Sequence, residues 1–154
     1  DDRAAVDRIR AIRRIDERHL LTLMCRDLSD IGQYAKFDDR RYRLLKNATP
    51  GPYTLILEAT KEVPRRLSHP SRKTIGLRVP DHRVALGLLD VLGQPLLTTT
   101  LQLPGDELPL NEGELIRERL DYQIDFVLDA GTCGVQPTTI VDLTGAEAVL
   151  AGDK

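Results

Sequence analysis

Arg78 is a charged residue in a part of the sequence that otherwise predicts a buried strand. Its neighbours in the run Ile75-Gly76-Leu77-Arg78-Val79 are small or aliphatic, which favours an extended, buried segment. A guanidinium buried there without an anionic partner would destabilise the fold by several kcal/mol. We therefore expect an anion next to Arg78. This anion is either a carboxylate of the protein, the more common partner, or a bound phosphate.

Two threonine clusters supply hydroxyl groups that suit the same chemistry. Thr98-Thr99-Thr100 and Thr138-Thr139 each lie at the edge of an apolar run. Hydroxyls and backbone N–H groups at strand ends, beside an arginine, are able to bind phosphate or ribose in a fold without a phosphate-binding loop. The alternative is structural, because β-branched threonine is also a good strand residue.

Other catalytic and metal-binding patterns are missing from the sequence. It contains no Walker A loop and no GxGxxG, GxSxG or HExxH motif. His19, His69 and His82 are far apart and flanked by polar residues, and Cys25 and Cys133 form no CxxC or Cys/His spacing. We therefore expect no structural metal, and free cysteines in a reduced, cytoplasmic compartment.

Charge is distributed unevenly along the sequence. The 154 residues carry a net charge of −2, but residues 1–80 hold 18 Lys+Arg against 11 Asp+Glu, whereas residues 81–154 hold 4 against 13. Such a division is typical of a protein with a basic face for phosphates or RNA beside an acidic face. Alternatively, the two halves interleave in space and neutralise each other. No apolar run reaches the roughly 18 residues of a membrane span, so no membrane partner is expected.

The spacing of apolar residues predicts helices that alternate with strands. The expected helices are Arg3–Arg14, a short one ending at Tyr34, one beginning at Asp38-Asp39, one from Pro80-Asp81 to Gly93, and Glu112–Leu120. The expected strands are Leu20–Cys25, Tyr53–Ala59, Lys73–Val79, Leu96–Leu103, Ile124–Leu128 and Thr138–Leu143. The helix beginning at Asp38-Asp39 is expected to carry Tyr42, Leu44 and Leu45 inward. This alternation indicates an α/β (α+β) fold in one domain, residues 1–154.

Five blocks of the sequence, in order along the chain, form a set that is more specific than any one of them. They are Leu23-Met24-Cys25-Arg26-Asp27-Leu28, Thr49-Pro50-Gly51-Pro52-Tyr53-Thr54, Lys61-Glu62-Val63-Pro64-Arg65-Arg66-Leu67, Ile75-Gly76-Leu77-Arg78-Val79-Pro80 and Pro137-Thr138-Thr139-Ile140-Val141-Asp142-Leu143. Together they resemble the YrdC/YciO domain family, and most closely its YciO-like branch. The resemblance implies a single twisted mixed sheet flanked by helices, with a large, positively charged concave surface.

The resemblance also implies a function. The family is associated with double-stranded RNA binding, and its best-characterised branch makes threonylcarbamoyl-adenylate from ATP, threonine and bicarbonate for tRNA modification. We therefore expect a cytoplasmic protein that binds nucleotide and RNA (tRNA or double-stranded RNA) and is related to these nucleotidyltransferases, with ATP and Mg²⁺ entering as substrate. A non-catalytic RNA-binding module and an interaction domain without a ligand site are the alternatives.

The family's motifs map onto particular residues of this sequence. The expected nucleotide- and phosphate-binding residues are Arg13, Arg78, Thr98, Thr100, Gln102, Thr138 and Thr139, and the expected substrate or RNA contacts are Thr54, Lys61, Arg65 and Arg66. The Lys-x-Arg motif of the synthase branch matches Arg13 and Ile15, so one cation is changed and the other is lost. Because a charged hydrogen bond contributes about 1.5 to 3 kcal/mol, this loss predicts a weakened site.

The resemblance further predicts a segment before the position of Asp1, with the pattern Pro-Thr-x-x-x-Tyr-x-Leu-Gly, that helps to form the substrate site of the family. The sequence does not contain this pattern. We therefore expect a YrdC-like fold that lacks its N-terminal segment, with weak binding of an amino-acid substrate and an exposed edge of the sheet.

Overall fold

The computed structural model describes residues 2–151, which group into two compact units. Unit 1 comprises residues 2–16 and 99–136, and unit 2 comprises residues 17–98 and 137–151. Unit 2 contains all of the strands. They are β1 (Thr22–Met24), β2 (Ala35–Lys36), β3 (Tyr53–Ala59), β4 (Thr74–Arg78), β5 (Leu96–Thr98), β6 (Thr139–Asp142) and β7 (Val149–Leu150). The expectation of one domain stays a prediction.

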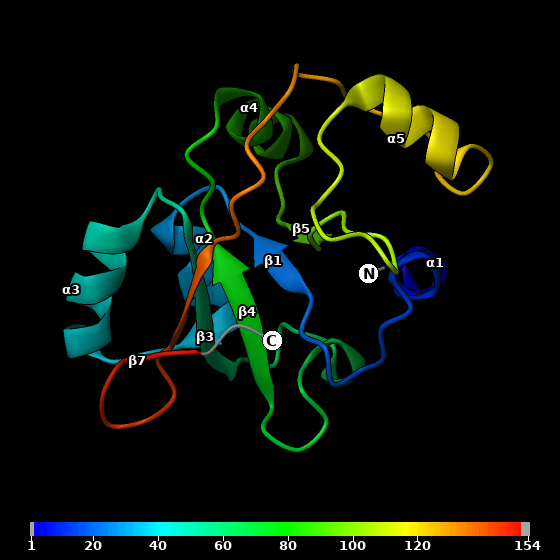
Figure 1. Cartoon of the computed structure of the whole chain (residues 1–154). Helices are drawn as coiled ribbons and strands as arrows, with labels where there is room; N and C mark the ends of the chain where they lie inside the picture. The colour runs from blue at the N-terminus through cyan, green and yellow to red at the C-terminus, as the bar shows by residue number, and fades with distance from the viewer. Residues whose placement is uncertain (1, 152–154) are drawn as a thin grey trace. The chain divides into compact units, whose positions relative to one another are not determined.

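The seven strands form a single mixed sheet in the order β5-β1-β4-β3-β6-β7, with β2 also paired to β3 (Figure 1). Strand β1 is parallel to β4 and β3 is parallel to β6, whereas the other neighbours are antiparallel. The carboxyl ends of β1 and β4 therefore lie at the same end of the sheet as the amino ends of β3 and β6. This arrangement confirms the predicted α/β fold with one mixed sheet.

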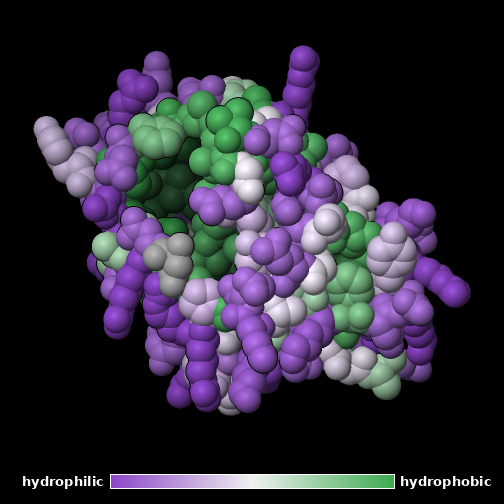
Figure 2. All heavy atoms as spheres, turned by 180° about the vertical axis from the view of Figure 1, so that it is seen from behind, coloured by the Kyte–Doolittle hydropathy of each residue, from purple (hydrophilic) through white to green (hydrophobic). Residues whose placement is uncertain are grey.

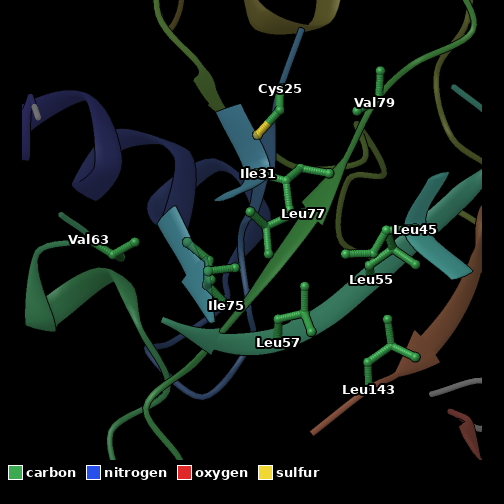
Figure 3. Close-up of a cluster of buried hydrophobic side chains, with 11 residues drawn as sticks. Cys25, Ile31, Leu45, Leu55, Leu57, Val63, Ile75, Leu77, Val79 and Leu143 are labelled. Carbon is green, nitrogen blue, oxygen red and sulfur yellow. The ribbon is translucent and has the colours of Figure 1, made fainter. Parts of the chain in front are cut away.

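One face of the sheet carries the hydrophobic core of unit 2. The strand register pairs Leu23 with Leu77 and Leu77 with Leu55, and since side chains alternate along a strand, these residues share a face. Two helices, α2 (Leu28–Tyr34) and α3 (Asp39–Ala48), add Ile31 and Leu45 to the same buried cluster, as Figure 3 shows. The opposite face carries the residues that alternate with these leucines, and it combines threonines and Arg78 with apolar residues such as Met24 and Ile56.

Local capping groups define the ends of these helices. The Asp27 side chain accepts a hydrogen bond from the Asp30 N–H at 2.9 Å, and the Asp38 side chain accepts one from the Arg41 N–H at 2.9 Å. Helix α4 (Arg83–Leu92) ends at Gly93, whose φ of 68° is the left-handed conformation that glycine adopts without strain. Between β3 and β4, a short 3₁₀ turn, η1 (Arg65–Leu67), follows Pro64. The end of α2 at Tyr34, the start of α3 at Asp39 and the end of α4 before Gly93 agree with the predicted boundaries.

The inward face of α3 differs from the prediction. Leu45 is fully buried, but Tyr42 and Leu44 are 44% and 36% exposed, and Arg41 is buried in their place. Arg41 lies four residues before Leu45, so it belongs to the same stripe of the helix. Its Nη2 donates a hydrogen bond to the carbonyl oxygen of Gly145 at 2.8 Å. This bond offsets part of the free-energy cost of burying the charged guanidinium.

Unit 1 contains two helices, α1 (Arg3–Arg13) and α5 (Gly113–Leu120), joined by irregular segments. The predicted strand Ile124–Leu128 is wrong, because this segment has no strand partner among residues 2–151. Phe126 and Leu128 are instead 79% and 56% exposed. The predicted strand Leu96–Leu103 ends early, at Thr98. In both places the residue types favour a strand, but a strand forms only where a neighbouring strand hydrogen-bonds to the backbone.

Candidate functional site

Arg78 is the last residue of β4. It is half-buried and lies on the face of the sheet opposite the hydrophobic core. Its carbonyl oxygen accepts a hydrogen bond from the Cys25 N–H at 2.8 Å, and its register partner on β1 is Met24. Within the described part of the chain, no carboxylate forms an ion pair with its guanidinium, and its buried Nε has no hydrogen-bond partner. Burial lowers the pKa of Arg78 below the usual value for arginine. Residues 2–151 thus supply no carboxylate partner for this cation.

Two threonine hydroxyls, bonded to each other, lie on the same face of the sheet as Arg78. The Oγ1 atoms of Thr54 and Thr138 are 2.6 Å apart and share one hydrogen bond. Continuing the β3–β4 register by one residue beyond the pair Leu55 and Leu77 places Thr54 opposite Arg78. Each hydroxyl keeps acceptor capacity after this bond, and the pair has one donor hydrogen to spare. The end of the sheet therefore combines a cation with a hydroxyl pair.

Gly76 forms the floor of this face. A Cβ atom at this position would lie 3.4 Å from the Oγ1 of Thr22 and 3.4 Å from the Cγ2 of Thr54, so these side chains flank the glycine closely. The Thr98 hydroxyl donates to the carbonyl oxygen of Thr22 at 2.9 Å, and Thr98 is paired with Thr22 in the register. We name this surface the threonine face; its residues are Thr22, Thr54, Gly76, Arg78, Thr98 and Thr138.

Thr138 precedes β6 and Thr139 is its first residue, and the two threonines have different surroundings. Thr139 pairs with Tyr53 in the register, whereas Thr54 pairs with Ile140, and Thr138 is two residues before Ile140. Thr138 therefore lies on the threonine face, and Thr139 lies on the opposite face. The Thr139 N–H donates to the carbonyl oxygen of Pro52 at 2.9 Å. Of this predicted pair, only Thr138 shares a face of the sheet with Arg78, and it reaches toward that residue through its bond to Thr54.

Three of the predicted nucleotide-binding residues lie in unit 1. The Nη1 of Arg13 donates to the Thr99 hydroxyl at 2.7 Å and to the Thr100 carbonyl oxygen at 2.6 Å. The side-chain amide of Gln102 donates to the carbonyl oxygen of Asp106 at 2.9 Å. Burial lowers the pKa of Arg13, and its Nε has no hydrogen-bond partner within residues 2–151. The Nη1 atom of Arg13 therefore holds residues 99 and 100 in place. The Nε–H group of the same guanidinium is left as an unused donor.

Arg13 also borders a mainly apolar pocket of about 280 Å³ in unit 1. Its lining includes residues of α1, of α5 and of the segment after α5, among them Ile9, Ile116 and Phe126. On the face shown in Figure 2, hydrophilic residues dominate, and hydrophobic ones gather around a hollow.

Lys61, Arg65 and Arg66 lie in the β3–β4 loop (residues 60–73), away from Arg78. This loop joins the carboxyl end of β3 to the amino end of β4, whereas Arg78 is at the carboxyl end of β4. Figure 1 shows the loop at the foot of the β4 arrow and Arg78's end of the strand at its head. The structure therefore separates these three cations from the threonine face.

Sequence reasoning missed Thr22 and Gly76 as members of the face. The signal was present in part, because Thr22 interrupts an apolar strand in the same manner as Arg78. Among the described residues, no group of three or more His, Cys, Asp or Glu side chains is arranged to hold a metal ion. None of the helices in residues 2–151 is long and apolar enough to span a membrane.

These features define an α/β protein whose mixed sheet has one apolar face and one face with threonines, a glycine floor and an uncompensated arginine. A family model for the Sua5/YciO/YrdC group, described as telomere recombination, matches residues 1–151. The chain therefore belongs to the Sua5/YciO/YrdC family. This confirms the resemblance to the YrdC/YciO domain.

Related proteins fall in two groups. The crystal structure of Escherichia coli YciO is 48% identical, with a TM-score of 0.92, over 97% of this chain and 73% of that one. The threonylcarbamoyl-AMP synthase of Idiomarina loihiensis is 31% identical over 143 residues, 90% of this chain and 75% of that protein. The structure of P. abyssi Sua5 complexed with L-threonine is 25% identical, with a TM-score of 0.85, over 97% of this chain and 44% of that one. The chain is thus related to both YciO and the threonylcarbamoyl-AMP synthases.

Proposed function

We propose that the threonine face binds the phosphates of a nucleotide, with ATP and Mg²⁺ as the ligand. The observation that carries this proposal is Arg78, a half-buried cation with no carboxylate partner among the described residues. The strand register places Thr54 opposite it, and the Thr54 hydroxyl is bonded in turn to that of Thr138. A guanidinium in a partly desolvated position binds phosphate more strongly than in water.

The reaction proposed for this site is that of the related synthases. The amino group of threonine and bicarbonate form a carbamate with loss of water. An oxygen of that carbamate group attacks the α-phosphorus of ATP, the bond from this phosphorus to the oxygen that bridges to the β-phosphorus breaks, and pyrophosphate leaves. Arg78 would neutralise phosphate charge, together with Mg²⁺ brought by ATP, and the hydroxyls of Thr54 and Thr138 would align the phosphates. Ile15, in place of a second cation, predicts slower turnover than in the synthases. The protein would act in the cytoplasm.

We also propose RNA as a partner, either tRNA or a duplex. The excess of cations in residues 1–80 supports this, since phosphate contacts dominate the affinity for RNA. A non-catalytic RNA-binding module remains the second candidate, and it differs from the first in requiring no ATP. An interaction domain without a ligand site is disfavoured, because it predicts a carboxylate partner for Arg78.

The test compares Arg78→Gln with Arg40→Gln, which removes an exposed cation from α3. We expect millimolar ATP with Mg²⁺ to raise the melting temperature of the wild type and of Arg40→Gln. For Arg78→Gln we expect about 10- to 100-fold weaker ATP binding, as the loss of a charged hydrogen bond implies. Pyrophosphate release in the presence of ATP, threonine and bicarbonate measures turnover in the same three proteins. An identical ATP response in all three would refute the assignment of Arg78.

A further inference from the structure

The β3–β4 loop concentrates positive charge at one end of the sheet. Its residues 60–73 contain five cations, Lys61, Arg65, Arg66, Arg72 and Lys73, and one acid, Glu62. Four of these cations, all except Arg66, are exposed, and none of the four forms an ion pair with another described residue. Elsewhere in unit 2, Arg26 and Lys36 have carboxylate partners, whereas the exposed cations Arg40, Arg43 and Lys46 of α3 have none among the described residues. The loop differs from α3 in holding its cations on an irregular segment. The loop is thus a cationic surface that the protein does not neutralise.

Successive turns hold this loop in a defined conformation. Val63 and Ser68 are buried, and Val63 is part of the main hydrophobic cluster. The Thr60 hydroxyl donates to the carbonyl oxygen of Gln33 at 2.7 Å, and the Ser68 hydroxyl donates to that of Arg65 at 2.9 Å. A surface whose backbone is already ordered loses less conformational entropy when a partner binds.

His69 fixes the second half of the loop. Its Nδ1 accepts hydrogen bonds from the N–H groups of Ser71 at 3.3 Å and Arg72 at 3.2 Å. The Lys73 N–H donates to the His69 carbonyl oxygen at 3.0 Å, and the Lys73 carbonyl oxygen accepts from the Ala59 N–H at 2.9 Å. These bonds bring Arg72 and Lys73 back to the end of β3, next to the start of the segment that carries Lys61.

We propose that the β3–β4 loop, held by His69, is a docking surface for the phosphate backbone of an RNA duplex, separate from the threonine face. The inference rests on the proposed RNA partner and assigns it a place. Arginine and lysine that project from a rigid loop bind phosphates without reading bases, so recognition is independent of sequence.

The loop chemistry favours RNA over a membrane surface. Attachment to a bilayer generally adds buried apolar side chains to the electrostatic attraction. None of the large hydrophobic side chains of the β3–β4 loop is exposed, since Val63 is buried and Leu67 is only partly accessible. Its contacts are therefore purely electrostatic, and they suit a regular array of phosphates.

The test neutralises two matched sets of exposed cations. The triple substitution Lys61→Gln, Arg65→Gln and Arg72→Gln alters the loop, and the triple substitution Arg40→Gln, Arg43→Gln and Lys46→Gln alters α3 by the same charge. Binding to a fluorescent RNA duplex of about 20 base pairs is measured over a range of salt concentrations. We expect the loop variant to bind at least tenfold more weakly at low salt and its salt slope to fall by about 2 to 3, because each lost phosphate contact removes about 0.9 from the slope. The α3 variant should bind within about threefold of the wild type.

Each outcome supports the inference or overturns it. If the wild type and the loop variant bind the duplex equally well, the loop assignment is overturned and the proposed RNA partner is kept. Wild type that does not bind at low salt would overturn both. Capture of wild type by phosphatidylserine vesicles but not by RNA would replace the RNA with a membrane surface. If melting curves show that the triple loop variant is unfolded, the single substitutions Arg65→Gln and Arg72→Gln decide the same question.

Discussion

The hydroxyl pair between Thr54 and Thr138 joins two strands that are far apart in sequence. Their Oγ1 atoms are 2.6 Å apart, and Thr54 is among the buried polar residues. A buried hydroxyl that loses its partner costs more than an exposed one, since water does not replace the bond. The pair therefore contributes both to stability and to the order of the threonine face.

Replacement of Thr54 by valine tests this contribution. We expect Thr54→Val to lower the free energy of unfolding by about 1 kcal/mol, because the side-chain volume is nearly kept while the hydrogen bond is lost. Thr139→Val is the matched control: it alters the neighbouring, exposed threonine of β6, and we expect a change within about 0.5 kcal/mol. Urea unfolding of both variants provides the measurement. Equal changes in the two proteins would contradict a special role for the pair.

At the scale of elements, the β3–β4 loop shows how one side chain orders a whole connection. His69 accepts from two backbone N–H groups and ties residues 69–72 into a tight turn. Lys73 then adopts a φ of 55°, a left-handed conformation that a non-glycine residue rarely adopts without local support. The loop's order thus depends on an acceptor at the position of His69 Nδ1.

Trypsin reports on this order, because the loop offers it Arg65, Arg66, Arg72 and Lys73. We expect His69→Ala to raise the cleavage rate after Arg72 and Lys73 several-fold, since the turn opens more often without its acceptor. His69→Asn places a carbonyl oxygen close to the position of Nδ1 and should restore most of the protection. Cleavage sites are identified by mass spectrometry. A rate in His69→Ala equal to that of the wild type would show that the turn is held by other bonds.

The elements that the sequence predicted best are those with local signals. The aspartate caps of α2 and α3, Gly93 after α4 and the aliphatic run of β3 each act within a few residues. Ile124–Leu128 was predicted as a strand and is not one, because strand formation depends on a partner that no local pattern reveals. The two-residue strand β2 was missed for the same reason, since it exists through its pairing with Ala59 and Glu58.

The candidate site was predicted in part for a related reason. Arg78 stood out because one charged residue conflicted with its own strand. Its neighbours Thr22 and Thr54 depend on the register of three strands, which the sequence does not contain in any one segment. Register also separates Thr138 from Thr139 and places Lys61 and Arg65 at the other end of β4.

At the scale of the molecule, the uneven charge of the sequence is only partly neutralised. Ion pairs join the two halves of the sequence at Arg26 with Asp90, 3.6 Å apart, and at Arg8 with Asp125, 3.5 Å apart. Both are exposed pairs, which contribute little to stability. Four cations of the β3–β4 loop, Lys61, Arg65, Arg72 and Lys73, have no such partners among the described residues, nor do the exposed cations of α3. The basic part of the sequence thus remains basic in the fold, as the proposed RNA partner requires.

The stability of the molecule is expected to depend on pH through Cys25, which is fully buried at the end of β1. Burial, with smaller effects of Asp30 and Asp27, raises the pKa of its thiol from the usual 9.0 to about 12. Below about pH 9 the thiol is protonated in both states and pH has no effect through it. Between about pH 9 and 12 only the unfolded chain releases the proton, so the free energy of unfolding falls as pH rises.

This prediction is tested by comparing the wild type with Cys25→Ala in urea at pH 8 and pH 10.5. Both proteins lose stability through other groups that titrate in this range, so the quantity of interest is the difference between their losses. A shift of one pKa unit corresponds to about 1.4 kcal/mol, and we expect the wild type to lose about 2 kcal/mol more than the variant over this interval. Cys133 is exposed, and Cys133→Ala should behave as the wild type does. Equal losses in wild type and Cys25→Ala would mean that the thiolate is accommodated in the fold, and that β1 opens to water at the end that carries the threonine face.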